Sequence, residues 1–311
     1  MRMRRGRPDL DRYAAMFDLP RASDGSATDR LSVTFGGVST LLFSDGRSGV
    51  LFDGFFTRLP LVRVAARRIA PDPVLIEEGL RRIGATGIDV EAVLPVHSHY
   101  DHALDSAEVS RRTGAVLVGG ASTANLGRGA GVPEERLQTP APGEPHGLGS
   151  WTLTLTESTH CPPDRFPGVI SAPVVPPARS SAWKCGEAWS AHLRHESGAT
   201  ALVQGSAGFV PGALEGTSAD VVYLGVGQLG IHPDSYLQGY WDHVVRACSP
   251  RTVVLTHWDD FFRPADQPLR ATPYAFDDLD RTIAFLRERA EADGVALSLP
   301  TIWRAEDPWA R

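Results

Sequence analysis

The chain has 311 residues, of which 42% are hydrophobic and 22% charged, values that are ordinary for a soluble globular protein. A net charge of −6 gives no electrostatic footprint for DNA or RNA, so we expect a small-molecule substrate rather than a nucleic acid. The cysteines Cys161, Cys185 and Cys248 are too few and too scattered for a disulfide framework, and the charged N-terminus is not followed by an apolar run. These features predict a cytoplasmic protein with no membrane insertion; they say nothing about its oligomeric state.

Short strands separated by turns are predicted in the first half of the chain, after a polar N-terminal arm over residues 1–30. We expect residues 31–311 to form a single domain. Asp72 stands before a proline and is a suitable N-cap for the first long helix. Strands are predicted over residues 31–37, 39–45, 49–54, 90–96, 115–120 and 151–159, and helices over 72–84, 102–114 and 122–131.

A proline-rich loop over residues 161–188 interrupts this order. Loops of this length inside a compact domain are unusual and are often functional lids. After it, strands are predicted within residues 187–206 and over 219–227, 251–257 and 295–300, with helices over 234–249 and 276–293. Strands in both halves, with helices between the later ones, predict an α/β (α+β) fold of two mixed sheets packed together with helices outside.

Three histidines and an aspartate follow the strand predicted at residues 90–96 within six residues: His97, His99, Asp101 and His102. Imidazole and carboxylate ligands suit zinc. Alternate residues of a tight loop point the same way, so His97 and His99 can converge on one ion while Asp101 and His102 address a neighbouring one. The alternative is a polar loop whose histidines only cap the following helix, which does not account for four possible ligands in so short a stretch.

The run from His97 to His102 resembles the HxHxDH signature of the metallo-β-lactamase superfamily, and the resemblance extends in order from about Leu31 to Pro300. It implies the four-layer αββα sandwich of that superfamily. It also implies that Asp53 in "VLFDG" supports the histidine loop, and that His160 in "TESTHC" and His257 in "VVLTHWDD" complete two metal sites. The segments "TFGGVSTLLF" and "GGASTANLGRGAGVPEERL" look most like the branch around ascorbate-6-phosphate lactonase and N-acylphosphatidylethanolamine phospholipase D.

The chain departs from the family pattern at Ser206, in the turn "LVQGSAGF". Many members have an aspartate there that bridges the two metals, whereas a subgroup of zinc β-lactamases has no bridging protein ligand. The loss of a negative charge predicts a second zinc that is weakly held or partly occupied. By this likeness the first zinc is held by His97, His99 and His160, and the second by Asp101, His102 and His257.

The resemblance implies a zinc-dependent hydrolase in which a metal-bound hydroxide cleaves an ester, lactone or amide bond of a small, partly apolar substrate. Three alternatives stay open: a phosphodiesterase of the same fold, a mononuclear iron dioxygenase, and a metal-binding protein with reduced catalysis. Iron and manganese are the alternative metals.

Further residues are assigned by their place near these ligands, although each can also be an ordinary packing or surface residue. Asp259 follows His257 closely and can orient its imidazole. Aromatic side chains after Asp53 and around the proline-rich loop can line an apolar substrate pocket. The candidate catalytic residues are Asp101, Tyr100 and His192, with His232 as a further proton donor, and the candidate substrate-binding residues are Phe55, Phe56, Phe166 and Trp189.

Overall fold

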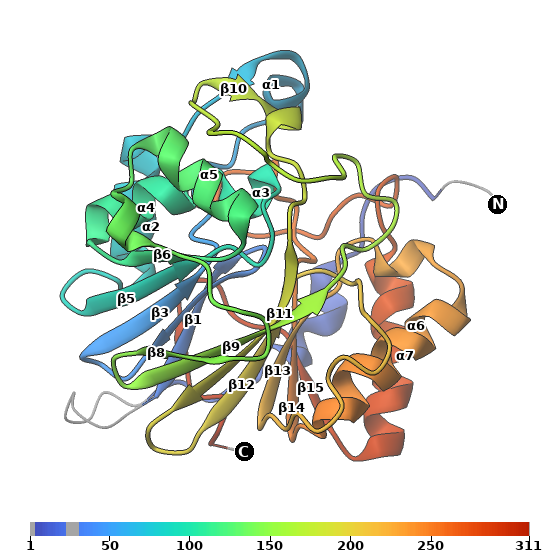
Figure 1. The fold of residues 1–311 in the computed structure, drawn as a ribbon. Coiled ribbons are helices and arrows are strands. Elements are labelled where there is room, and N and C mark those ends of the chain that lie inside the picture. The colour runs from blue at the N-terminus through green and yellow to red at the C-terminus, as the bar shows by residue number, and fades with distance from the viewer. Residues whose placement is uncertain (1–3, 23–30, 311) are drawn as a thin grey trace.

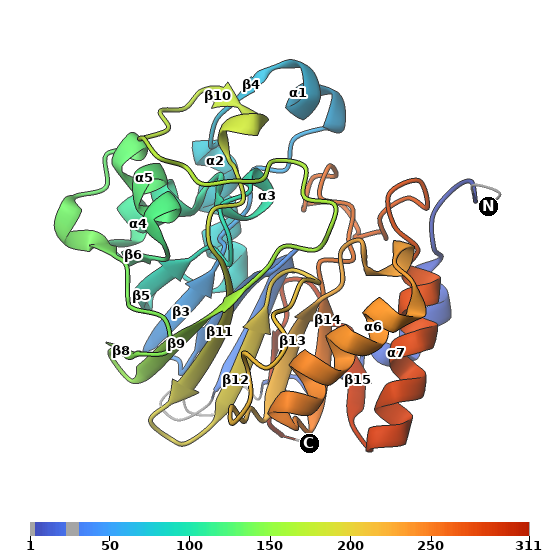
Figure 2. The same ribbon diagram turned by 45° about the vertical axis from the view of Figure 1, so that its right-hand side comes forward.

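Two seven-stranded sheets pack face to face in the computed structural model, which describes residues 4–22 and 31–310 (Figure 1). The first sheet has the strand order β16-β1-β2-β3-β5-β6-β7 and the second β15-β14-β13-β12-β11-β9-β8. Helices α2, α4 and α5 cover the outer face of the first sheet, and α6 and α7 cover that of the second (Figure 2). The predicted αββα sandwich is confirmed.

The first sheet comprises β1 (Ser32–Gly37), β2 (Thr40–Ser44), β3 (Ser48–Phe52), β5 (Asp89–Leu94), β6 (Val116–Val118), β7 (Leu137–Gln138) and β16 (Ala305–Glu306). The second comprises β8 (Pro145–Leu148), β9 (Trp151–Ser158), β11 (Ala188–His195), β12 (Thr200–Gln204), β13 (Val221–Gly225), β14 (Thr252–Thr256) and β15 (Ala296–Ser298). The α-helices are α1 (Leu61–Ala66), α2 (Pro73–Ile83), α3 (Tyr100–Ala103), α4 (Ser106–Thr113), α5 (Ala121–Ala130), α6 (Asp234–Tyr240) and α7 (Leu279–Asp293), and a π-helical turn (Trp241–Arg246) continues α6.

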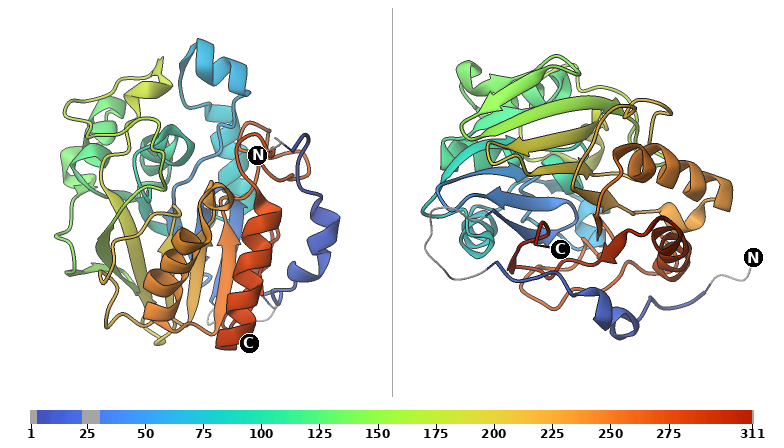
Figure 3. Two further views of the ribbon diagram at one scale, coloured as in Figure 1. Left: turned by 90° about the vertical axis from the view of Figure 1, so that its right-hand side faces the viewer. Right: turned by 90° about the horizontal axis from the view of Figure 1, so that it is seen from below.

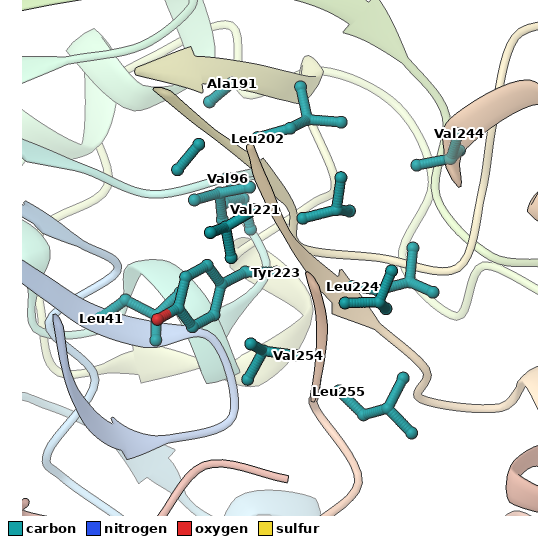
Figure 4. Close-up of a cluster of buried hydrophobic side chains, with 14 of the residues drawn as sticks. Leu41, Val96, Ala191, Leu202, Val221, Tyr223, Leu224, Val244, Val254 and Leu255 are labelled. Atoms are coloured by element: carbon teal, nitrogen blue, oxygen red, sulfur yellow. The ribbon is translucent and has the colours of Figure 1, made fainter. Parts of the chain in front are cut away.

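The core lies between the sheets and continues on both outer faces beneath the helices. On β13, Tyr223 points toward the first sheet, where its ring meets Phe43 edge-on at 5.4 Å between centroids. The next residue, Leu224, points the other way, toward Val244 in the helical layer (Figure 4). Strands β12, β13 and β14 run parallel and are buried on both faces, which explains their continuous hydrophobic sequence.

Local capping sets the ends of the helices. The Asp72 side chain accepts hydrogen bonds from the backbone N–H groups of Val74 and Leu75, and Gly84 ends α2 in the left-handed conformation. The helix expected over residues 102–114 is divided into α3 and α4. The division falls at Asp105, whose carboxylate accepts the N–H groups of Phe56 and Thr57 and so ties the helix junction to a neighbouring segment.

The expected N-terminal arm forms, over residues 4–22, a strap that passes beside α7 (Figure 3) and ends in an antiparallel bridge between Arg21 and Glu306 of β16. Tyr13, Met16 and Leu19 are buried in the main core, and the Tyr13 hydroxyl donates a 2.6 Å hydrogen bond to Asp280. The rest of the expected arm, residues 23–30, lies outside the described residues. No helix within residues 4–22 and 31–310 is long and apolar enough to cross a bilayer.

The proline-rich loop pairs with a segment far from it in sequence. Its short strand β10 (Ala178–Arg179) forms a two-stranded antiparallel sheet with β4 (Arg68–Ile69), which follows α1. Figures 1 and 2 show α1, β4 and β10 together above the ends of both large sheets. We call residues 54–71 and 165–186, which carry these elements, the cap.

Packing at Gly79 of α2 gives a first prediction. A Cβ atom at this position would lie 2.3 Å from the ring of Phe56. Although alanine is the better helix former, we expect Gly79→Ala to lower the free energy of unfolding by about 1–3 kcal/mol because the buried ring must shift. Urea unfolding measures this, with Glu77→Ala on the exposed face of α2 as the control. A Gly79→Ala protein as stable as the control would contradict the packing of Phe56.

Candidate metal centre

The site lies where the carboxyl ends of strands from both sheets meet. Asp53 follows β3, the histidine loop follows β5, His160 follows β9, and His257 follows β14. The structure brings the six predicted ligands together in two groups, in each of which the ligand atoms all lie within 4.8 Å of one another. The groups are His97, His99 and His160, and Asp101, His102 and His257. They adjoin, since the rings of His97 and His102 are 4.0 Å apart between centroids.

Hydrogen bonds on the outer side of the imidazoles decide which nitrogen faces inward. Nδ1 of His102 lies 2.7 Å from the Asp53 carboxylate, and Nδ1 of His160 lies 2.6 Å from the carbonyl oxygen of Cys161. Both acceptors require a proton on Nδ1, so the Nε2 lone pair of each ring is left for the interior. The Asp164 carboxylate, 3.1 Å from Nε2 of His99, likewise turns the Nδ1 lone pair of His99 inward.

The inward nitrogens face one another at hydrogen-bond distance. Nε2 of His97 is 3.1 Å from Nδ1 of His99, and Nε2 of His102 is 3.1 Å from Nε2 of His257. Burial lowers the pKa of His97, His99 and His160, that of His160 to about 4, so this group is neutral near pH 7. Nδ1 of His97 has no hydrogen-bond partner among the described residues, so the facing nitrogens of His97 and His99 can share one proton or both present lone pairs to a cation. The donor set fits a divalent metal such as zinc.

The second group contains a carboxylate and has a different electrostatic balance. Burial alone would raise the pKa of Asp101, but the imidazoles of His102 and His257 outweigh it and lower the pKa. Burial would lower the pKa of His102, but the carboxylates of Asp53 and Asp101 outweigh it and raise the pKa. One carboxylate and two imidazoles could hold a second cation, and this group carries a negative charge that the first group lacks.

Ser206 lines the same cavity as the two groups. Its hydroxyl oxygen accepts a 2.9 Å hydrogen bond from the backbone N–H of Cys161, which directly follows His160. Its carbonyl oxygen accepts hydrogen bonds from the side chains of Gln204 and Tyr240. The side chain at this position therefore positions the backbone next to His160 and supplies no charge to the site.

Asp259 supports His257 through the backbone rather than through its imidazole. The fully buried Asp259 carboxylate accepts a 2.7 Å hydrogen bond from Arg58 and a 2.8 Å one from the N–H of Val38. The carbonyl oxygen of Val38 in turn accepts the N–H of His257 at 2.7 Å. Val38 and His257 both have positive φ, near +55° and +58°, so this network holds two backbone conformations that L-residues rarely adopt.

A third group of possible ligands, His99, Asp164 and Cys185, uses the outer nitrogen of His99. That nitrogen of His99 faces two acceptors, the Asp164 carboxylate at 3.1 Å and the carbonyl oxygen of Phe166 at 3.4 Å, so it holds the proton when Nδ1 faces the first group. We therefore interpret Asp164 as a support for the His99 ring. Sequence reasoning missed it because the proline-rich loop has no periodic pattern.

The two groups open into a cavity of about 220 Å³. Tyr100 and Phe166 line it, together with Asp101 and the exposed edges of three ligand imidazoles. Its apolar wall comes largely from α1 and from the segment between β14 and α7, which sequence reasoning missed; these residues are Leu61, Val64, Phe261, Phe262 and Phe276. The wall makes the cavity mainly apolar apart from the ligands.

Three of the expected substrate-binding residues are corrected. Phe55 packs edge-on against the outer side of Tyr100, and Phe56 packs between α2 and Trp303. Trp189 is buried in the core between the sheets. None of the three lines the cavity, because the core on either side of the strand ends takes up their rings.

Of the candidate proton donors, one lies at the cavity and two lie away from it. Tyr100 lies at the cavity, and burial, followed by the effect of Asp101, raises its pKa well above the usual value. His192 is corrected: it lies on the face of β11 opposite to the buried Ala191 and Leu193, and its Nε2 is 2.9 Å from the carbonyl oxygen of Ser218. His232 lies against Cys161 and the carbonyl oxygen of Pro162, outside the residues that line the cavity.

Comparison with known proteins gives one family match. The model of a family described as the metallo-beta-lactamase superfamily matches residues 33–177. This range contains Asp53, the histidine loop and His160, and ends before Ser206 and His257.

A curated relative and two solved structures are similar to this chain. A UPF0173 metal-dependent hydrolase of Thermoplasma volcanium is 32% identical over 74 residues, 24% of this chain, and the match spans only 25% of the relative's length. The structure of an isothiocyanate hydrolase from Delia radicum gut bacteria has a TM-score of 0.52 and 16% identity, covering 88% of this chain and 96% of that one. That of CmlA, a diiron beta-hydroxylase from Streptomyces venezuelae, has a TM-score of 0.52 and 12% identity, covering 89% and 53%. At these identities the structural likeness shows the fold.

The buried Arg58–Asp259 pair gives a second prediction. Arg58→Leu would leave the buried Asp259 carboxylate without its counter-charge, so we expect the free energy of unfolding to fall by roughly 3–5 kcal/mol. Urea unfolding of the apo protein measures this loss. Arg81→Leu is the matched control, because Arg81 pairs with Glu78 on the exposed face of α2 and should change stability little. Equal effects of the two substitutions would show that the Arg58–Asp259 pair does not support the fold.

Proposed function

We propose that the chain is a zinc-dependent hydrolase of the metallo-beta-lactamase superfamily that acts on small, partly apolar substrates. The observation that carries the proposal is the convergence of six histidine and aspartate side chains in two adjoining groups at the wall of one cavity. Their inward lone pairs suit zinc, and the cavity gives a substrate access to them.

When bound, the metal would supply an activated water and a Lewis acid at the wall of the cavity. The residues of the chain then divide the remaining work. Asp53, Asp164 and the Cys161 carbonyl hold three imidazoles in the orientation that metal binding needs. Tyr100, whose raised pKa keeps its phenol protonated, can donate a hydrogen bond to a leaving group in the cavity.

The lining of the cavity favours an acyl substrate with an apolar portion. Its lining includes the carboxylates of Asp101, Asp260 and Asp277, and one cation, Arg165. Asp101 is one of the proposed metal ligands and Asp260 pairs with Arg7 and Arg270, so beyond the metal itself the lining offers a phosphodiester only the Arg165 side chain as a cationic partner. Because the remaining wall is largely apolar, we infer a substrate with an apolar portion next to the scissile carbonyl.

Metal stoichiometry gives a third prediction. We expect apo protein titrated with zinc to bind two ions per chain, the second more weakly, and His257→Ala to lose only the weaker one. Ser206→Asp adds a carboxylate to the wall of the cavity and should tighten the second ion by roughly tenfold or more. Isothermal titration calorimetry with elemental analysis measures both effects.

The control for that experiment is Ser206→Asn, which has nearly the same size as the aspartate variant but no charge. Tightening in the asparagine variant as well would assign the effect to shape rather than to charge. A wild-type protein that binds one iron and no zinc would contradict the zinc hydrolase and favour an iron enzyme.

Activity gives a fourth prediction. Zinc-loaded protein assayed with chromogenic esters, lactones, amides and phosphodiesters should cleave acyl substrates with an apolar group fastest. We expect His99→Ala to reduce kcat/KM by roughly a hundredfold or more, because metal ligation and its supports are lost together. Cleavage of phosphodiesters alone, or full activity in His99→Ala, would overturn the proposal.

A further inference from the structure

The cap is a concentrated basic surface on an acidic protein. Residues 54–71 and 165–186 contain seven arginines and lysines and no aspartate or glutamate, although the whole chain has a net charge of −6. Arg58 is buried against Asp259, and the other six are exposed. The exposed cations are Arg63, Arg67, Arg68, Arg165, Arg179 and Lys184. The two segments are about a hundred residues apart, and the pairing of β4 with β10 brings them together.

Two of these arginines are directly opposite each other. Arg68 on β4 and Arg179 on β10 are register partners in the two-stranded sheet, and both are exposed. Like charges at opposite positions of an antiparallel pair destabilise it. Within residues 4–22 and 31–310, no carboxylate forms an ion pair with either arginine, and Arg68 donates only to the carbonyl oxygen of Pro177. This arrangement leaves Arg68 and Arg179 without a counter-ion among the described residues, and an external anion would neutralise them.

The same surface is apolar where it is not charged. Val62 on α1 is 78% exposed, Val175 just before β10 is 67% exposed, and Leu61 is 41% exposed. Arg63 and Arg67 lie one turn apart on the solvent-facing side of α1, beside Val62 in a shallow groove lined by Pro60, Val62, Arg63, Ala66, Arg67 and Arg68. Arginines that surround exposed aliphatic side chains are typical of segments that lie at a membrane–water interface.

We propose that the cap is a docking surface for an anionic lipid bilayer. The arginines would contact phosphate groups of the lipids, and Val62 and Val175 would enter the interfacial region beside them. A nucleic acid could use the arginines but would gain nothing from exposed aliphatic side chains, so the combination favours the bilayer. This is peripheral docking and does not depend on the proposed hydrolysis.

Docking in this way would set the mouth of the cavity toward the lipid. Leu61 and Val64 of α1 and Phe166 of the proline-rich loop belong both to the cap and to the cavity wall. Substrates that partition into the bilayer would then reach the metal ligands along an apolar path.

The test is co-sedimentation of the full chain with vesicles of phosphatidylcholine and phosphatidylglycerol in a roughly 2:1 ratio. We expect binding at low salt that weakens as salt rises, and much weaker binding to phosphatidylcholine alone. The double substitution Arg63→Gln/Arg67→Gln should reduce the partition coefficient roughly 25-fold, from the usual contribution of each basic residue near an anionic surface. Val62→Ser should also reduce it, because an apolar contact is lost.

The matched control is Arg47→Gln/Arg194→Gln, which removes the same charge from exposed positions outside the cap. Absence of binding to anionic vesicles at low salt would overturn the proposal, as would an equal loss in the control. Binding that is insensitive to Val62→Ser and is competed away by duplex DNA or RNA would instead identify a nucleic-acid surface. The zinc stoichiometry and activity of the cap variants in detergent-free buffer report on the hydrolase separately, so either proposal can fail alone.

Discussion

The structure of the site depends on one buried carboxylate. Asp53, fully buried and with φ near +57°, accepts the N–H of Val96 at 3.0 Å and contacts Nδ1 of His102 at 2.7 Å. Val96 directly precedes the histidine loop and His102 ends it, so one side chain fixes both ends of the loop. A buried carboxylate is costly unless its partners are in place, and this cost makes the loop conformation a condition of folding.

The second carboxylate of this kind, Asp259, holds the other half of the site. It anchors Val38 and, through it, the backbone of His257, while its counter-ion Arg58 comes from the same segment as Asp53. Residues 53–58 therefore carry both the carboxylate that supports His102 and the counter-ion of the carboxylate that supports His257. His102 lies in α3, after β5 of the first sheet, and His257 follows β14 of the second. The second group of ligands comes together only when the two sheets pack against each other, because Asp101 and His102 follow β5 of the first sheet and His257 follows β14 of the second.

Local patterns made some of this predictable from the sequence. The spacing of the histidine loop and the capping of α2 by Asp72 and Gly84 depend on neighbours in the chain, so the sequence contains them. The position of Phe55 and Phe56 depends on tertiary partners, since Tyr100 and Gly79 take up the two rings in opposite directions. The outward direction of His192 could have been found from the alternation of β11, where Trp189, Ala191 and Leu193 face the core. The aromatic wall of the cavity could not have been found from the sequence, because the segment between β14 and α7 that carries it has no regular spacing of hydrophobic residues.

The charge of the cap depends partly on tertiary structure, which joins two segments far apart in the chain. Residues 54–71 already hold four arginines and no acidic residue, although the composition of the whole chain suggests an acidic protein. The pairing of β4 with β10 places Arg68 opposite Arg179, and the repulsion between these like charges lowers the stability of the pair. None of the 37 aspartates and glutamates in the chain is used to offset it among the described residues. Leu61 and Val64 connect this surface to the cavity, so the cost falls at the entrance to the metal ligands, where recognition of an anionic surface would offset it.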